Sequence, residues 1–457
     1  MERNLSPKLY LAILATGLMA FCGIVIETAM NVTFPTLMNQ FNVGTGTIQW
    51  LTTGYLLIVS IVIPLSGYLK RRFTNKRLFI SSSITFIIGL LICSFANSFP
   101  LLLAGRLIQG CGTGVALPLM FNIILEQAPL NKIGFLMGIG TLVTAVAPAL
   151  GPTYGGLLVD KDWHLIFIFL LIIMVFAVII GSISITQVTK TERISLDVLS
   201  WLSISIFFVG AILAFNSIEN SVISSLAFGL IGIFGLIAFV FRTKRVDSPL
   251  INGDIFKIPS FSLLLIGFII FQMILVGVAF ILPNYLQIVN GISSGVAGLL
   301  LLPGAALGAV LSPLSGKLYD SLGPKKPINL GLLLQAIALV LFITTALSSK
   351  PWQSTLGYIL LMLGTGFAMG NIMTSGLSQA SKELSADANA VFNTLQQFAG
   401  ALGTAVASLI IALFQTNSNL AGSTALGARV DFLVLACLLI IAAFAINLGL
   451  SKSTANK

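Results

Sequence analysis

The stretch Pro64–Leu69 (PLSGYL) returns further along the chain as Pro313–Leu318 (PLSGKL). Each copy ends an apolar stretch, and each is followed by a basic turn. The repeat indicates that the chain consists of two halves built on one plan. Repeated halves are what alternating-access transporters need, because rocking one bundle of helices against its copy exposes a central site to each side of the membrane in turn.

The composition around the repeat predicts a membrane protein. Of the 457 residues, 57% are apolar and only 8% are charged, and the mean hydropathy is +1.04. Apolar stretches of about 20 residues, the length that crosses a bilayer as a helix, run from Leu9 almost to Leu450 with short polar loops between them. A chain of this composition cannot bury its apolar surface in water, so we expect the bilayer to be its solvent.

Hydropathy predicts an all-α polytopic protein with about fourteen transmembrane helices. The expected spans are roughly 9–34, 48–69, 78–97, 100–125, 133–158, 165–186, 198–216, 221–241, 261–283, 295–316, 328–347, 354–377, 389–414 and 430–450. We expect three parts: a six-helix bundle over 1–190, an inserted helix pair with its flanking cytoplasmic linkers over 191–250, and a second six-helix bundle over 251–457.

Lys and Arg residues are concentrated in the alternate turns, which fixes the expected orientation. With the N-terminus inside, one side of the membrane carries only Lys161, Lys350 and Arg429. The other side carries Lys70, Arg71, Arg72, Lys76, Arg77, Lys132, Lys190, Arg193, Arg242, Lys244, Arg245, Lys257, Lys317, Lys325, Lys326 and Lys382. The positive-inside rule therefore predicts a multi-pass protein of the cell membrane with both termini in the cytoplasm, and it accounts for the net charge of +10 without a nucleic-acid partner.

Two charged residues within the spans are the strongest functional candidates. Glu27 is the only carboxylate well inside any predicted span, and Arg106 is the only basic residue clearly inside one. Ionisable groups in a bilayer are unfavourable enough that they usually have a function. The alternatives are a structural, hydrogen-bonded Glu27 and an Arg106 that extends to the membrane surface.

A run in the fifth span, Gly151–Gly156 (GPTYGG), predicts a bendable and closely packed segment. Pro152 lacks a backbone donor, while Gly151, Gly155 and Gly156 lack side chains, so the segment is suited to a gate. An ordinary kinked helix is the alternative. The two repeat copies and the turns that follow them form cytoplasmic loop motifs, whose candidate residues are Gly67, Arg72, Gly316, Asp320 and Gly323.

Amide and hydroxyl side chains inside the spans allow two interpretations. In lipid, an amide needs a partner, so most such residues are expected to hold helices together. Five of them are also candidates for lining a substrate cavity: Asn31, Gln49, Tyr55, Asn393 and Gln397.

These stretches resemble the 14-helix drug:proton antiporters of the major facilitator superfamily, in the branch typical of Gram-positive bacteria. Glu27–Pro35 is similar to the first-helix signature of that family, Arg106–Gly110 to its Arg-x-x-Gln-Gly motif, and Gly151–Gly156 to its antiporter motif Gly-Pro-x-x-Gly-Gly. The resemblance implies two six-helix bundles plus two inserted helices. It also implies a role in proton transfer for Arg106 and a direction of transport out of the cell.

The turn after the first repeat copy departs from the family pattern. Arg71 stands where the family has Asp, and Thr74 where it has a second Gly, whereas the second copy keeps Asp320 and Gly323. A charge-based lock is therefore better sought at the second copy than at the first.

The resemblance also implies a mechanism of coupling. At about 1.5 Å per residue, Glu27 lies roughly 10 Å and Arg106 roughly 9 Å below the outer ends of their helices, and the family places these helices side by side around the cavity. Burial favours a neutral Glu27, whereas pairing with Arg106 favours the carboxylate. Movement between the two environments would make Glu27 a proton switch, with the deprotonated form favouring a lipophilic cation.

We therefore expect a monomeric, proton-coupled exporter of small lipophilic drugs or dyes, cationic or zwitterionic, that works by alternating access. The sequence holds no nucleotide-phosphate loop, catalytic triad or metal cluster, so we expect no enzyme activity, no ATP drive, no cofactor and no metal. Two alternatives stay open. One is an exporter of a dedicated metabolite, peptide or siderophore, and the other is a channel or a membrane sensor that transports nothing.

Overall fold

The computed structural model describes residues 6–43, 45–48, 50–159, 161–192, 194–218, 221–246, 249–292, 294–348, 350–381 and 383–455. Within these ranges the chain forms helices joined by short turns and contains no strand. The prediction of an all-α protein is confirmed.

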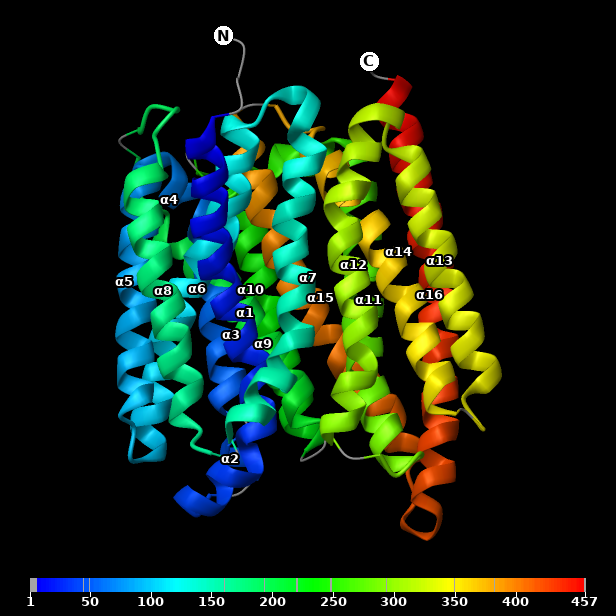
Figure 1. Ribbon diagram of the computed structural model, residues 1–457. Helices are drawn as coiled ribbons and strands as arrows, with labels where there is room; N and C mark the ends of the chain where they lie inside the picture. The colour runs from blue at the N-terminus through cyan, green and yellow to red at the C-terminus, as the bar shows by residue number, and fades with distance from the viewer. Residues whose placement is uncertain are drawn as a thin grey trace. The chain divides into compact units, whose positions relative to one another are not determined.

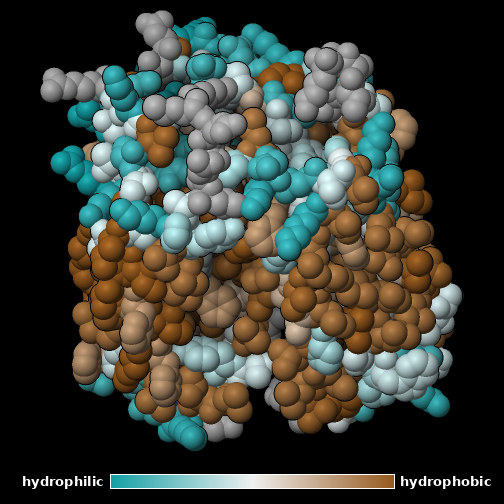
Figure 2. All heavy atoms as spheres, turned by 45° about the horizontal axis from the view of Figure 1, so that its top comes forward, coloured by the Kyte–Doolittle hydropathy of each residue, from teal (hydrophilic) through white to brown (hydrophobic). Residues whose placement is uncertain are grey.

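The helices are long and apolar enough to span a bilayer. Among the described residues, thirteen helical segments meet that description, and α15, Ser385–Phe414, is a further helix of 30 residues. Only 17% of the most apolar stretch of α10, Val222–Thr243, is buried within the protein, so most of this helix is available to lipid. On the face shown in Figure 2, hydrophobic residues form a broad band and hydrophilic residues gather mainly at one end.

The chain divides into two compact units. Unit 1 comprises Met1–Leu130, Leu150–Gly253 and Lys382–Thr394, and unit 2 comprises Asn131–Ala149, Asp254–Ser381 and Leu395–Lys457. Two helices belong to both units: α7, Ile133–Val159, begins in unit 2 and ends in unit 1, whereas α15 begins in unit 1 and ends in unit 2.

Unit 1 holds the helices of the first half and the inserted pair (Figure 1). They are α1 Pro7–Phe41, α2 Thr45–Ile48, α3 Trp50–Val62, α4 Ser66–Arg72, α5 Asn75–Ser94, α6 Phe99–Gln127, α8 His164–Ser184, α9 Val198–Ser217 and α10. A 3₁₀ turn, Ile63–Leu65, joins α3 to α4. Helix α6 packs against α1, α3 and α5, while α8 packs against α1 and α5. The inserted helices α9 and α10 pack on each other, and α9 also contacts α3.

Unit 2 repeats this packing with the helices of the second half. They are α11 Pro259–Ile288, α12 Ser294–Leu322, α13 Lys325–Thr345, α14 Pro351–Leu377 and α16 Leu420–Ala455. Helix α14 packs against α11, α12 and α13, as α6 does against α1, α3 and α5. Helix α16 packs against α11 and α13, as α8 does against α1 and α5. The repeat in the sequence thus extends to the packing of the helices.

Glycines at matching places allow the close approach of these helices. A Gly-Thr-Gly run occurs in α6 at Gly112–Gly114 and again in α14 at Gly364–Gly366. A Cβ at Gly112 would lie 2.8 Å from the carbonyl oxygen of Ser82 on α5, and a Cβ at Gly364 would lie 2.7 Å from that of Gly331 on α13. Only glycine permits backbones this close, which is how helices without a hydrophobic driving force between them pack in lipid.

The first and last helices extend beyond the predicted spans. Helix α1 ends at Phe41 rather than near 34, and α16 begins at Leu420 rather than near 430. Hydropathy marks only the part of a helix that lies in hydrocarbon, whereas the backbone hydrogen-bond pattern continues into the interface. The longer α16 places Asp431 well inside a helix rather than at its end.

Candidate functional site

Arg106 on α6 is the centre of a buried polar cluster in unit 1. Its side chain is fully buried (0% exposed). Its Nε donates to the carbonyl oxygen of Leu51 at 3.1 Å, and its Nη1 donates to Oε1 of Gln109 at 2.7 Å. The guanidinium lies over the ring of Tyr55, 4.2 Å from its centroid, an arrangement that stabilises a cation. Nη2 is buried and has no hydrogen-bond partner in the described part of the chain, so the cation keeps a donor available for an acceptor.

Glu27 on α1 is near this cluster but not bonded to it. Its side chain is partly buried, and its charge interacts electrostatically with that of Arg106. Among the described residues, no nitrogen of a basic side chain lies within 4.0 Å of a Glu27 carboxyl oxygen. The structure therefore leaves the carboxyl of Glu27 within electrostatic range of the Arg106 cation but without an ion pair to it.

Hydrogen bonds fix α1 to the same cluster one turn before Glu27. The hydroxyl of Tyr55 on α3 donates to the carbonyl oxygen of Gly23 and contacts Oγ1 of Thr113, each at 2.8 Å. A Cβ at Gly23 would lie 2.5 Å from Cγ2 of Thr113. Helices α1, α3 and α6 therefore meet at a single point, which sets the position of Glu27 relative to Arg106.

The glycines of α7 pack on the two residues of α1 that follow Glu27. A Cβ at Gly151 would overlap Oγ1 of Thr28, and a Cβ at Gly155 would lie 2.6 Å from the carbonyl oxygen of Ala29. Gly156 is half-buried, and the side chain of Pro152 lies outside the described part of the chain. Because Thr28 and Ala29 follow Glu27 directly, any bend of α7 at these glycines acts on the segment of α1 that carries the carboxyl.

We expect Gly155→Ala to reduce transport strongly, because a Cβ at this position meets backbone rather than a side chain that can rotate away. The matched control is Gly229→Ala on α10, where the nearest atom to a Cβ is the Cβ of Ala214 at 3.9 Å. Efflux rates of ethidium, normalised to protein in the membrane, should fall at least tenfold for Gly155→Ala, the effect of about 1.4 kcal/mol on a barrier, and stay unchanged for the control. Equal rates for the two variants would place the gate elsewhere.

The turn after the second repeat copy forms a polar contact that we call the second-loop latch, made of Gly316, Asp320, Gly134 and Phe135. Asp320 on α12 accepts hydrogen bonds from the backbone N–H groups of Gly134 at 3.0 Å and Phe135 at 3.2 Å. These donors are in the first turn of α7, where backbone N–H groups lack partners in the helix and a negative charge is stabilised. A Cβ at Gly316 would overlap the carbonyl oxygen of Gly134, so the repeat glycine permits this contact.

Gly323 ends α12 directly after the second-loop latch. Its φ of +78° lies in the left-handed region, and its N–H donates to the carbonyl oxygen of Tyr319 at 3.0 Å. Glycine adopts this conformation without strain, which explains its place at the helix end.

The first repeat copy forms an equivalent contact with the charges rearranged, which we call the first-loop latch: Gly67, Arg71, Asp387 and Asn252. Asp387 is 1% exposed and lies in the first turn of α15. Its Oδ2 accepts the N–H of Asn252 at 3.1 Å, and its Oδ1 lies 3.7 Å from Nη2 of Arg71. A Cβ at Gly67 would lie 2.6 Å from that Oδ1. In both latches an acid lies at a helix N-terminus against a repeat glycine, but here α15 itself supplies the acid and the end of α4 supplies the cation.

We expect Arg71→Ala to slow transport more than Arg72→Ala. Arg71 also donates to the carbonyl oxygen of Pro249, whereas Arg72 is exposed and joins none of the ion pairs in the described ranges. A partly exposed ion pair contributes about 1 kcal/mol to the stability of the contact it holds. Its loss should therefore lower the efflux rate of Arg71→Ala about threefold to tenfold. Equal effects of the two substitutions on ethidium efflux would mean that these residues act only through their charge.

The five residues predicted to line a substrate cavity lie in different surroundings. Gln49 and the side chain of Asn31 lie outside the described residues, and Tyr55 is fully buried. The amide of Asn393 donates to Oδ1 of Asn389 at 2.7 Å, and the amide of Asn389 donates to Oδ1 of Asn122 at 2.8 Å. This amide chain links α15 to α6, as expected for amides in lipid. Gln397 is half-buried.

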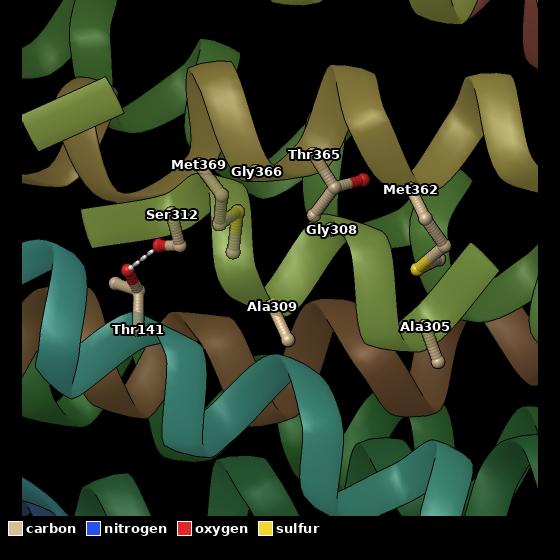
Figure 3. A pocket seen from close by; sticks show the side chains of 9 residues that line it. All are labelled: Thr141, Ala305, Gly308, Ala309, Ser312, Met362, Thr365, Gly366 and Met369. Atoms are coloured by element: carbon tan, nitrogen blue, oxygen red, sulfur yellow. Dashed lines mark hydrogen bonds between the residues drawn. The ribbon is translucent and has the colours of Figure 1, made fainter. Parts of the chain in front are cut away.

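Two cavities within the units are too small for a drug, which needs about 300–1,000 Å³. The cavity in unit 2 has a volume of about 10 Å³, room for at most one water molecule. A hydrogen bond of 2.8 Å between Thr141 on α7 and Ser312 on α12 lies at one end of it (Figure 3). The cavity in unit 1, of about 90 Å³, is lined by polar residues that include Arg71, Glu192 and Asp197.

Several residues of these sites were not predicted from the sequence. Asp387 lies just before a predicted span, so hydropathy assigns it to a turn. The sequence predicts that Lys70 helps to set the orientation in the membrane. In the structure it also forms a buried ion pair with Glu126, with 2.6 Å between Nζ and Oε1. Asp431 is the second residue of the predicted span 430–450, yet in the structure it is fully buried. One feature of the sequence could have indicated Asp387 and Asp431: each acid lies within four residues of the end of a predicted span. A helix that extends beyond the span can bury an acid at such a position. No group of three or more metal-ligating side chains occurs in the described part of the chain.

Comparison with known proteins agrees with this architecture. The family model of the Major Facilitator Superfamily matches residues 16–404. The lincomycin resistance protein LmrB of Bacillus subtilis is 39% identical over 407 residues, which cover 87% of this chain and 84% of the relative. LmrB of Listeria monocytogenes serovar 1/2a is 37% identical over 409 residues, 88% of this chain and 87% of the relative. A multidrug resistance protein B homolog of Mycobacterium tuberculosis is 26% identical over 395 residues, 84% of this chain and 73% of the relative.

Solved structures of similar fold are more distant in sequence. The human organic anion transporter MFSD10 has a TM-score of 0.68 at 14% identity, with 97% of this chain and 100% of that chain covered. The proton:xylose symporter XylE has a TM-score of 0.66 at 15% identity, with 95% of this chain and 94% of that chain covered. At these identities the likeness concerns the fold alone.

Proposed function

This chain belongs to the Major Facilitator Superfamily and is a multi-pass membrane transporter rather than an enzyme, and on that premise we propose that it is a proton-coupled antiporter. It exports lipophilic cationic or zwitterionic drugs from the cytoplasm by alternating access and works as a monomer. The names of its relatives, two of them lincomycin resistance proteins and one a multidrug resistance protein B homolog, support drugs as the substrate class.

The observation that carries the proton coupling is the arrangement of Glu27 and Arg106. Arg106 is fully buried, is held by Leu51, Gln109 and Tyr55, and retains an unpartnered Nη2. Glu27 interacts with this charge without an ion pair. A short movement of α1 or α6 would make the pair and favour the carboxylate, and the opposite movement would favour the protonated acid. A proton and a cationic drug can therefore alternate at one carboxyl.

The gates of this cycle, in our proposal, are the α7 glycines and the two latches. Gly151 and Gly155 contact the residues that follow Glu27, and each latch holds the first turn of a helix shared by both units. The expected division into a six-helix bundle over 1–190, an inserted pair over 191–250 and a second bundle over 251–457 completes the proposal, and the matching contacts of α6 and α14 support it.

Efflux from inside-out membrane vesicles tests the function. When the lumen is more acidic than the medium, vesicles that contain the protein should accumulate lincomycin and the lipophilic cation ethidium. A protonophore, which collapses the pH difference, should abolish this accumulation. Uptake that resists the protonophore would exclude proton coupling. Absence of uptake of both compounds would favour a dedicated substrate.

We expect the cell-membrane orientation to place both termini in the cytoplasm, because the basic residues lie on one side. In a variant without the four native cysteines, Lys350→Cys should react with an impermeant maleimide added to intact cells, whereas Lys76→Cys should react only after the cells are opened. Both positions are exposed on the protein surface, so access to the reagent depends on the side of the membrane. Labelling of Lys76→Cys in intact cells would reverse the orientation.

A further inference from the structure

A second buried carboxyl lies in unit 2, on α16. Asp431 is 0% exposed, and both of its carboxyl oxygens are buried without a hydrogen-bond partner. It lies in the apolar helical segment Leu420–Lys452, about 16 Å from the start of α16 at 1.5 Å per residue. It is therefore an acid inside the membrane, and it belongs to neither the Arg106 cluster nor the latches.

The neighbouring helices offer this carboxyl apolar contacts. The next residue, Phe432, stacks on Phe342 of α13 with ring centroids 4.8 Å apart. One turn further, Leu435 lies 3.7 Å from a Cβ built at Gly277 of α11. Asp387 has a backbone N–H and a cation against it, whereas among the described residues Asp431 has neither.

The charged and titratable groups on the helices around Asp431 point elsewhere or lie far away. On α11 the candidate is Tyr285, whose hydroxyl donates to the carbonyl oxygen of Ala346 at 2.6 Å. On α13 they are Lys325 and Lys326 in the first turn, about 25 Å along the helix from Phe342 at 1.5 Å per residue. On α16, Arg429 is two residues away and so about 200° around the helix, and Lys452 is in the last turn. The part of α15 that belongs to unit 2, residues 395–414, has no charged or titratable side chain.

Neither form of this carboxyl is stabilised by its surroundings as the structure has them. An ionised, unpaired carboxylate is strongly disfavoured in an apolar interior, so the neutral acid is the form that fits. Even the neutral acid leaves its hydroxyl without an acceptor, which leucine would avoid. An acid at this place is therefore explained by a second state of the transporter, in which water or a cation reaches it and it releases its proton.

We propose that Asp431 is a second proton-binding site of the transport cycle, in addition to Glu27. The proposal rests on the proposed function. In one state the carboxylate takes up a proton from water on the outer side and becomes the neutral acid. In the other state the same O–H bond breaks and the proton leaves to water on the cytoplasmic side, so that charge and atoms balance with no further reactant.

The number of protons per cycle determines which gradient drives export. With Glu27 alone, one proton enters for each monovalent cation that leaves, and no net charge crosses the membrane. With Asp431 as well, two protons enter and one positive charge moves inward in each cycle. A membrane potential, negative inside, then drives export of a monovalent cation even when the pH is equal on both sides.

The experiment compares two driving forces in proteoliposomes with ethidium as the monovalent probe. The wild-type protein should transport ethidium when a potential is imposed at equal pH, and also when a pH difference is imposed without a potential. Asp431→Asn, which keeps the size and neutrality of the protonated acid, should lose the potential-driven transport and keep the pH-driven transport. Asp254→Asn, a change of an exposed carboxyl in unit 2 that pairs with Lys257, should keep both.

Potential-driven transport that persists in Asp431→Asn, or that is missing from the wild-type protein while pH-driven transport is present, would overturn the proposal. If the wild-type protein transports no ethidium under either gradient, the proposed function fails for this substrate class, and an infrared titration decides on Asp431 alone. A protonated Glu27 gives a carbonyl band of the same kind, so the band of Asp431 is the one that is present in the wild-type spectrum and missing from that of Asp431→Asn. If the Asn variant does not fold, Asp431→Glu should shift this band, and an unchanged band would exclude a proton at this position.

Discussion

Glu27→Gln is expected to abolish proton-coupled drug efflux while the protein still reaches the membrane. The amide has the size of the protonated acid and no charge, so it holds Glu27 permanently in the form that fits a neutral, partly buried position. It cannot release a proton, and it cannot offer a negative charge to Arg106 or to a cationic drug. Because no step of the exchange avoids this carboxyl in our proposal, transport should fall to the level of membranes without the protein.

Drug-induced proton release from the purified protein measures this effect directly. Addition of ethidium to the wild-type protein in weakly buffered detergent solution should acidify the medium, and Glu27→Gln should lose the proton that Glu27 supplies. Glu27→Asp keeps a carboxyl but shortens the side chain by one carbon, and it should retain part of the efflux. Full efflux in Glu27→Gln vesicles would refute the coupling role and direct attention to Asp320 or to Asp431.

Arg106→Ala is expected to damage both transport and stability. The substitution leaves the carbonyl oxygen of Leu51 and Oε1 of Gln109 without their donor and removes the cation from the face of Tyr55. A hydrogen bond to a charged group is worth about 1.5–3 kcal/mol, so the free energy of unfolding should fall by about 3 kcal/mol or more. Loss of the cation also removes the partner that favours the ionised form of Glu27.

Arg106→Lys separates the charge from the hydrogen bonds. Lysine keeps the positive charge but lacks the fork of donors that reaches Leu51 and Gln109 together. We expect it to recover part of the efflux at a melting temperature still below that of the wild-type protein. If Arg106→Ala melts at the wild-type temperature and transports normally, the buried guanidinium is a structural remnant without a part in coupling.

The two latches show why a motif can depart from its family pattern and still form its contact. In the second-loop latch, Asp320 near the end of α12 accepts hydrogen bonds from the N–H groups of Gly134 and Phe135. In the first-loop latch the end of α4 carries Arg71, and the acid, Asp387, belongs to the first turn of α15. Both arrangements put a negative charge at a helix N-terminus, which is what the backbone dipoles favour.

The fold class, the approximate spans and the repeat can be predicted from the order of the amino acids. These follow from local properties: an apolar stretch of bilayer length must become a helix, because hydrocarbon offers no other partner for the backbone. The sequence also identified Glu27 and Arg106, because a charge inside such a stretch stands out from its apolar neighbours. It located the glycines of α7 as well, although not the residues of α1 on which they pack.

Which side chains meet depends on how the helices pack. The partners of Arg106 come from α3 and from α6 itself, and Asp387 meets Arg71 across more than 300 residues of chain. Two features of the structure make Asp431 a candidate. Helix α16 begins ten residues earlier than hydropathy predicts, and both carboxyl oxygens are buried without partners among the described residues. The physical reason is that burial and pairing depend on the surfaces of several helices at once, whereas hydropathy is a property of one helix alone.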